Sequence, residues 1–100
     1  MNRYDAFAHE KVAVDAVTSL TAATYAPAGG IAARRAIITC ETDAVRCCWD
    51  GSTPAADVGH LFPVSAKINE VLVLEGLNNI RNFKAIKVTL AAVLRATYER

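Results

Sequence analysis

The sequence predicts an all-β fold: a single small antiparallel β-sandwich, of the jelly-roll or immunoglobulin-like kind, with about seven to eight short strands and at most one or two helical turns. Three observations support this prediction. Short segments rich in valine, isoleucine and threonine recur along the chain, turn-forming residues separate them, and two of the segments alternate between the faces of a strand.

The composition is that of one domain with a surplus of apolar residues. One hundred residues form a single domain on ordinary size grounds, and 53% of them are hydrophobic while 21% are charged. Average proteins have about 45–50% and about 25%. We therefore expect part of the apolar surface to close against another chain, as in a homo-oligomer.

The charges argue against two classes of partner. The net charge is +1, from 11 basic and 10 acidic residues, and Arg34–Arg35 is the one adjacent basic pair. Without a basic stripe we expect no nucleic-acid binding, and without a run of about 18 apolar residues we expect no membrane partner. The start lacks a signal-peptide pattern, and three cysteines, two of them adjacent, do not suggest a disulfide framework, so we expect synthesis in a reducing cytosol.

The chain divides into an expected N-terminal arm, residues 1–10, and a sandwich domain, residues 11–100. The first ten residues mix charges and aromatic rings without a clear period. Tyr4 and Phe7 are the expected anchors of this arm in pockets of a neighbouring molecule. The alternative is a strand or helix that folds back on its own sandwich.

The first half of the domain reads as strands interrupted by one loop. Lys11–Val14 and Val17–Tyr25 favour strands through valine, threonine and tyrosine. Ala26–Gly30 is a loop because it combines a proline with two glycines. Arg35–Thr42 follows as a strand rich in β-branched residues.

The middle of the chain holds a strand that ends in a sharp turn. In Asp43–Asp50, alternate residues share one face, and the Asp-Gly pair that follows is a strong turn signal because glycine adopts positive φ readily. Thr53–Asp57 is expected to start a single helical turn, with the threonine as its cap and proline at its first position. The structural turn residues predicted here are Asp50, Gly51, Pro54 and Gly59.

The second half contains the remaining expected strands. These are His60–Val64, Asn69–Gly76, Phe83–Val88 and Ala92–Arg100, with a turn or one-turn helix at Leu77–Asn82. The main rival is a helix over Ile86–Ala96, where alanine and leucine are good helix formers. The alternation at the end of the chain favours a strand instead.

No catalytic, cofactor-binding or metal-binding residue is predicted. Zinc sites usually place cysteines two to four residues apart, whereas Cys47 and Cys48 are adjacent and point to opposite faces of a strand. For the same reason we expect no disulfide between them. Buried free cysteine is the commoner case.

Two other functions remain open on the residues alone. A small enzyme would use Cys48 as its nucleophile with His60 as its base. A carbohydrate- or ligand-binding module would place Trp49 beside Tyr25 or Phe62 as a stacking platform.

Three stretches resemble a family of small virion proteins of tailed bacteriophages: "AVRCCWDGSTPAADVGHLF", "LVLEGLNNIRNFKAI" and the closing "AVLRATYER". The resemblance covers roughly residues 17–100. The sequence departs from the family pattern at Ala55, where threonine is expected, and at Cys47–Cys48, where basic or aromatic residues are usual. The matching residues are Val45, Arg46, Asp50, Gly51, Pro54, Gly59, His60, Leu77, Phe83, Ile86, Thr97 and Tyr98.

This resemblance implies a structural protein without enzymatic activity or cofactor. It would be made in the cytoplasm of a bacterial host and reside in the virion, most simply as a capsid decoration or cement protein. Its partners would then be itself and the major capsid protein or another virion protein. A place in the neck or tail is the alternative.

Overall fold

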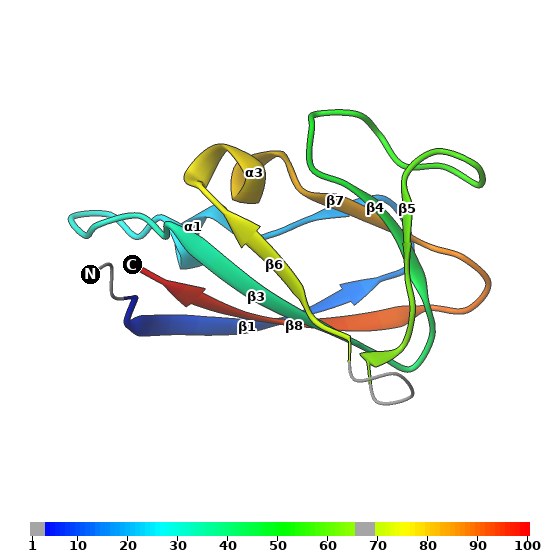
Figure 1. Cartoon of the computed structure of the whole chain (residues 1–100), viewed down its shortest axis with the longest axis horizontal. Coiled ribbons are helices and arrows are strands. Elements are labelled where there is room, and N and C mark those ends of the chain that lie inside the picture. The colour runs from blue at the N-terminus through cyan, green and yellow to red at the C-terminus, as the bar shows by residue number, and fades with distance from the viewer. Residues whose placement is uncertain (1–3, 66–69) are drawn as a thin grey trace.

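The computed structural model describes residues 4–65 and 70–100 and confirms the all-β prediction. The described residues form two antiparallel sheets of four strands each, with strand orders β1-β8-β3-β6 and β2-β7-β4-β5 (Figure 1). The strands are β1 (Ala6–Val14), β2 (Thr18–Ser19), β3 (Arg35–Glu41), β4 (Val45–Cys48), β5 (His60–Phe62), β6 (Leu72–Glu75), β7 (Lys84–Lys87) and β8 (Ala92–Glu99). The short helices are α1 (Ala22–Tyr25) and α3 (Leu77–Asn82).

Alternation explains the central strands. In β8, Leu94, Ala96 and Tyr98 are buried, whereas Arg95 between them is exposed. Successive side chains of a strand point to opposite faces, so this pattern suits a strand with one face on the core. The rival helix over Ile86–Ala96 is absent, since β7 and β8 occupy its two ends. The strand expected over Asn69–Gly76 is β6; Asn69 itself lies outside the described residues.

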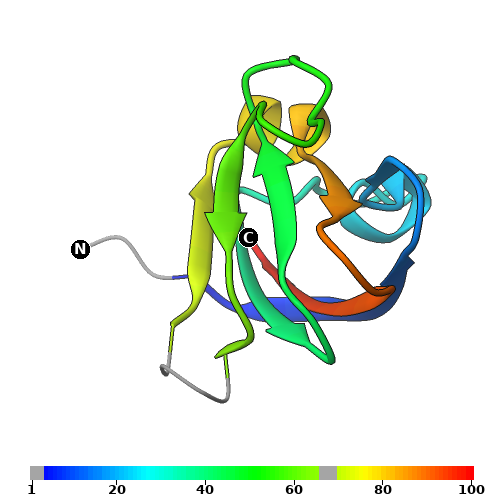
Figure 2. The same ribbon diagram turned by 90° about the vertical axis from the view of Figure 1, so that its right-hand side faces the viewer.

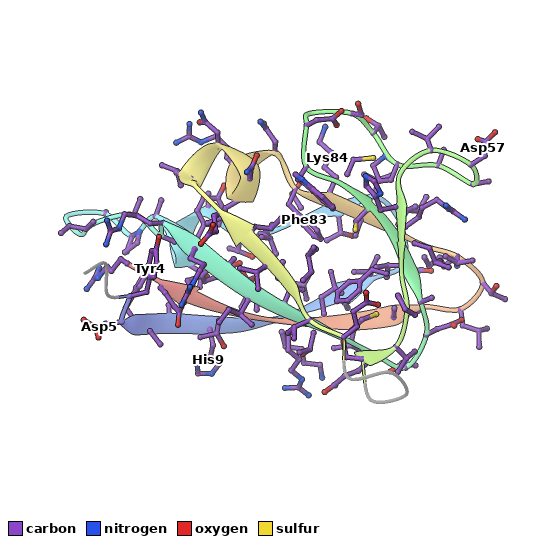
Figure 3. All side chains as sticks on the ribbon, viewed as in Figure 1. Tyr4, Asp5, His9, Asp57, Phe83 and Lys84 are labelled. Carbon is purple, nitrogen blue, oxygen red and sulfur yellow. The ribbon has the colours of Figure 1, made fainter. Side chains whose placement is uncertain are left out.

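Aliphatic side chains, two tyrosines and two phenylalanines dominate the core between the sheets. Phe83, Ile38, Ile80 and Leu94 are each at most 1% exposed, and Phe83 points into the interior in Figure 3. Each such side chain stabilises the fold by about 1.5–3 kcal/mol when fully buried. Within the described ranges no polar or charged residue is buried, so this core holds no group whose charge must be compensated.

Two local predictions were wrong. Val17–Tyr25 is not one strand: only Thr18–Ser19 pairs, and α1 follows, because its turn carries Tyr25 inward against Tyr98 at 5.8 Å between ring centroids. Thr53–Asp57 is not helical. Ala55 and Val58 instead exchange two backbone hydrogen bonds across a tight turn of two residues.

The structure also differs from the expected arm. Ala6–Glu10 is the first part of β1, which pairs with β8 along its length, and Asp5 exchanges two backbone hydrogen bonds of 3.0 Å with Arg100. The alternative of a strand folded back on its own sandwich therefore holds for these residues. Met1–Arg3 lie outside the described residues.

A carboxylate on the inward side of β1 joins three parts of the fold. Glu10 Oε2 accepts a hydrogen bond from the hydroxyl of Tyr98 in β8, and a second, of 3.1 Å, from the backbone N–H of Thr21, the residue before α1. Tyr98 is 0% exposed. Burial, together with this carboxylate, raises the pKa of Tyr98 well above its ordinary value.

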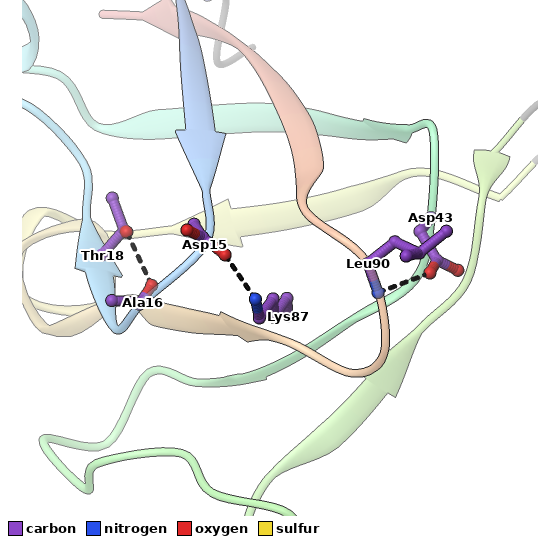
Figure 4. A network of polar contacts seen from close by, with 6 residues as sticks. All are labelled: Asp15, Ala16, Thr18, Asp43, Lys87 and Leu90. Atoms are coloured by element: carbon purple, nitrogen blue, oxygen red, sulfur yellow. Dashed lines mark hydrogen bonds and ion pairs between the residues drawn. The ribbon is translucent and has the colours of Figure 1, made fainter.

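Polar contacts fasten the loops at one end of the sandwich (Figure 4). Lys87 of β7 forms an ion pair of 2.5 Å with Asp15, which follows β1. Asp43, between β3 and β4, accepts a hydrogen bond of 2.9 Å from the backbone N–H of Leu90, which lies between β7 and β8. These contacts connect turns that are distant in the sequence.

Two glycines shape the loop that joins β4 to β5. Gly51 has a φ of 94°, in agreement with the Asp-Gly turn expected there, and Gly59 has a φ of 112°. A Cβ at Gly59 would lie 2.8 Å from the carbonyl oxygen of Cys47 and 3.0 Å from Sγ of Cys48, whereas a Cβ at Gly51 would meet no atom within 4 Å. Gly59 therefore lets this loop return close to β4.

Replacing the two glycines by alanine should separate backbone strain from steric contact. We expect Gly51→Ala to lower the free energy of unfolding by about 1 kcal/mol through the positive φ alone. Gly59→Ala should lower it by about 2 kcal/mol or more, because the contact with the Cys47 carbonyl adds to the strain. Urea unfolding of the two variants measures the difference. Equal losses would contradict the close approach at Gly59.

The buried thiols and Tyr98 should make the fold sensitive to alkali. Burial raises the pKa of Cys47 to about 12 and that of Cys40 to about 11, whereas an unfolded cysteine loses its proton near pH 8.5 and tyrosine near pH 10. Above the pKa values of the unfolded chain, its cysteines and tyrosines have released protons that the buried groups of the folded chain still hold. The free energy of unfolding should therefore fall as pH rises, by up to roughly 1.4 kcal/mol per pH unit for each group.

Urea unfolding between about pH 8 and about pH 11 tests this dependence. Cys47→Ala removes one of the groups, so it should make the decline shallower even though it lowers stability at neutral pH. A decline as steep as in the wild-type chain would contradict the role of this thiol.

Candidate functional site

A surface pocket of about 330 Å³ lies where the loop between β4 and β5 returns to β4. All of its lining residues come from the segment 48–60, which contains the chain's one tryptophan. Its lining residues are Cys48, Trp49, Asp50, Ser52, Val58, Gly59 and His60.

Two stacked rings form one wall of the pocket. The rings of Trp49 and His60 lie 5.0 Å apart between centroids with an interplanar angle of 23°. The strand register produces this pair: β4 and β5 pair Cys47 with His60, and Trp49, two residues after Cys47, lies on the same face. Trp49 is half-buried and His60 is exposed, so the pair bridges the edge of the core and the surface.

Asp50 supplies a negative charge beside these rings. Its carboxylate accepts a hydrogen bond of 3.0 Å from the backbone N–H of Ser52. That N–H, the Ser52 hydroxyl and the nearby His60 all lower the pKa of Asp50. The carboxylate is therefore ionised at neutral pH and acts as a hydrogen-bond acceptor.

A second hollow, of about 180 Å³, lies on the other side of the stacked rings. It is largely apolar and opens between β5 and the start of β6. Its lining residues are Cys47, Trp49, His60, Leu61, Phe62, Glu70, Val71 and Leu72. Trp49 and His60 thus line both hollows.

Cys48 and His60, which an enzyme would use as nucleophile and base, both line the pocket of about 330 Å³. Cys48 lies against Gly59, and His60 stacks on the indole of Trp49. All three cysteines are buried. Burial raises the pKa of Cys40 to about 11 and that of Cys47 to about 12, so that both of these thiols are neutral at physiological pH.

Trp49 stacks on His60, and not on Tyr25 or Phe62 as predicted for a ligand-binding platform. Tyr25 and Phe62 are each 5% exposed and belong to the core, so neither is available to a ligand. Sequence reasoning paired His60 with Cys48 rather than with Trp49. The signal that could have found the pair is the Asp-Gly turn followed by Gly59, because these residues return the chain so that His60 faces Trp49 across the ladder.

The predicted partner anchors lie elsewhere. Tyr4 packs over the guanidinium of Arg35 at 4.1 Å, and Phe7 packs under that of Arg100 at 4.3 Å. In Figure 3, Tyr4 lies at one end of the molecule and Asp57, in the loop between β4 and β5, lies at the other. Both aromatic rings therefore contact arginines of their own chain and take no part in the pocket.

The described part of the chain contains neither a cluster of metal-binding side chains nor a membrane-spanning helix. In residues 4–65 and 70–100, no three histidine, cysteine, aspartate or glutamate side chains come close enough together to hold a metal ion. No helix there has the length and apolar character needed to cross a membrane.

No protein-family model, no curated protein and no solved structure matches the chain.

Proposed function

We propose that the chain is a non-enzymatic structural protein of a tailed-phage virion, most simply a capsid decoration or cement protein that associates with itself and with the shell. The three stretches that resemble small virion proteins motivate the virion assignment. The observation that carries the proposal is a side of the sandwich where two open sheet edges and exposed apolar side chains occur together.

That side is formed by β5 and β6, which run next to each other in Figure 2. Each is the last strand of its sheet, and no strand of the described residues pairs with its outer edge. Leu61, Val71 and Val73 on this side are 54%, 48% and 48% exposed. We call these three residues and the two strand edges the β5–β6 side.

An open strand edge with apolar side chains favours pairing with another chain. Its unpaired N–H and C=O groups form a ready template for a further strand. Covering Leu61, Val71 and Val73 would add a hydrophobic contribution to association.

The charge of the chain is compatible with a crowded assembly. A net charge of +1 produces little repulsion between neighbouring copies on a shell. The alternative position is the neck or tail of the virion, where the same strand edges and apolar side chains would form the contacts.

A charge on the β5–β6 side should prevent association. Val73→Glu adds a carboxylate where the side chain is about half exposed, so the core remains intact. We expect sedimentation to show oligomers for the wild-type chain and monomers for Val73→Glu. Immunoblots of gradient-purified phage particles should detect the wild-type chain and not the variant.

Leu90→Glu is the matched control. Leu90 is 64% exposed and lies in the loop between β7 and β8, away from the β5–β6 side. It should assemble as the wild-type chain does. A monomeric wild-type chain that is absent from particles would contradict the proposed function, and equal loss in both variants would contradict the proposed surface.

A further inference from the structure

We infer that the pocket of about 330 Å³ beside Trp49 binds a neutral sugar ring. Sugar rings have an apolar face of C–H groups and a rim of hydroxyls, so their sites combine an aromatic or apolar wall with hydrogen-bonding side chains. The pocket has both: Trp49 and Val58 are its apolar groups, and Asp50, Ser52 and His60 are its polar side chains.

The polar groups suit hydroxyls better than other ligands. The Asp50 carboxylate is acceptor-only and can accept from two hydroxyls with the lone pairs that Ser52 does not use. The Ser52 hydroxyl, which donates to Asp50, can accept from a ligand, and the His60 imidazole can donate and accept. A ligand whose hydroxyls both donate and accept can satisfy all three groups.

Charge selects against anionic ligands. The Asp50 carboxylate repels a phosphate or a carboxylate, and no lysine or arginine lines the pocket to offset it. A neutral ligand avoids this repulsion.

The pocket is built on a loop with several internal fixed points. The Asp50–Ser52 hydrogen bond closes one turn, the Ala55–Val58 bridge closes the next, and Gly59 brings the loop against β4. A loop held in this way loses little conformational entropy when a ligand binds. Because the pocket is open and accommodates one ring, we expect a dissociation constant on the order of 1 mM.

This site does not depend on the virion assignment. The pocket borders the β5–β6 side through His60, the first residue of β5, but sugar binding requires no second copy of the chain. Sugar binding is measured on the purified chain in solution, so failure of one proposal leaves the other unaffected.

Trp49 is the chain's one tryptophan, so its fluorescence reports on this pocket directly. The probes are D-glucose, D-galactose and N-acetyl-D-glucosamine, with glucuronate as the anionic comparator. We expect a saturable change with at least one neutral probe and a weaker response to glucuronate. No saturable response, or a response to glucuronate alone, would overturn the inference.

Asp50→Asn is the diagnostic variant. The asparagine oxygen can still accept the Ser52 N–H, so the turn should persist while the charge is lost. We expect affinity to fall about tenfold or more. Asp57→Asn makes the same chemical change on the exposed tip of this loop, outside the pocket, and should bind as the wild-type chain does. Equal affinity in the two variants would overturn the role of Asp50.

Nuclear magnetic resonance of the wild-type chain gives an independent readout that needs no variant. Amide shifts should change around Asp50, Ser52 and Gly59 when the neutral probe is added. Changes centred elsewhere would overturn the site.

Discussion

The hydrogen bond from Tyr98 to Glu10 is the contact on which the rest of the sandwich depends. The Tyr98 side chain is fully buried, and a buried hydroxyl without a partner is costly. Glu10 supplies that partner from β1, and it also accepts the N–H of Thr21 at the start of α1. One carboxylate thus connects the first strand, the last strand and the helical turn whose Tyr25 packs edge-on against Tyr98.

This anchoring holds β1 in its sheet. β1 covers the outer edge of β8, and the backbone pairs of Asp5 with Arg100 extend that ladder to the end of β8. Within the described residues the end strands β1, β2, β5 and β6 each have one unpaired edge. Exposed Leu61, Val71 and Val73 distinguish the β5–β6 side, and neither Glu10 nor Tyr98 lines the pocket beside Trp49.

The parts of the fold that sequence reasoning predicted depend on local patterns. Arg35–Glu41 is rich in β-branched residues and Ala92–Glu99 alternates, so their strands could be read directly, and glycine after Asp50 marked the turn. Leu77–Asn82 was expected as a turn or one-turn helix and forms α3. Each of these features is determined within a few residues.

The parts that were missed depend on distant contacts. Ala6–Val14 did not read as one strand because its inward face carries Glu10, and the reason for a carboxylate there is a tyrosine 88 positions away. The strand propensity of Val17–Tyr25 gave way to the packing of Tyr25 on Tyr98. The Trp49–His60 stack depends on the pairing of β4 with β5, which composition does not reveal.

Hydrogen exchange of the backbone amides tests the central claim most directly. If Glu10 and Tyr98 hold β1 in the sandwich, the amides of Ala6–Val14 that bond to β8 should be protected to nearly the same degree as those of β8 itself. The Glu10→Gln variant should lose part of this protection in β1. Rapid exchange throughout Ala6–Val14 beside a protected β8 would show that the first strand is only loosely attached, and would contradict the account.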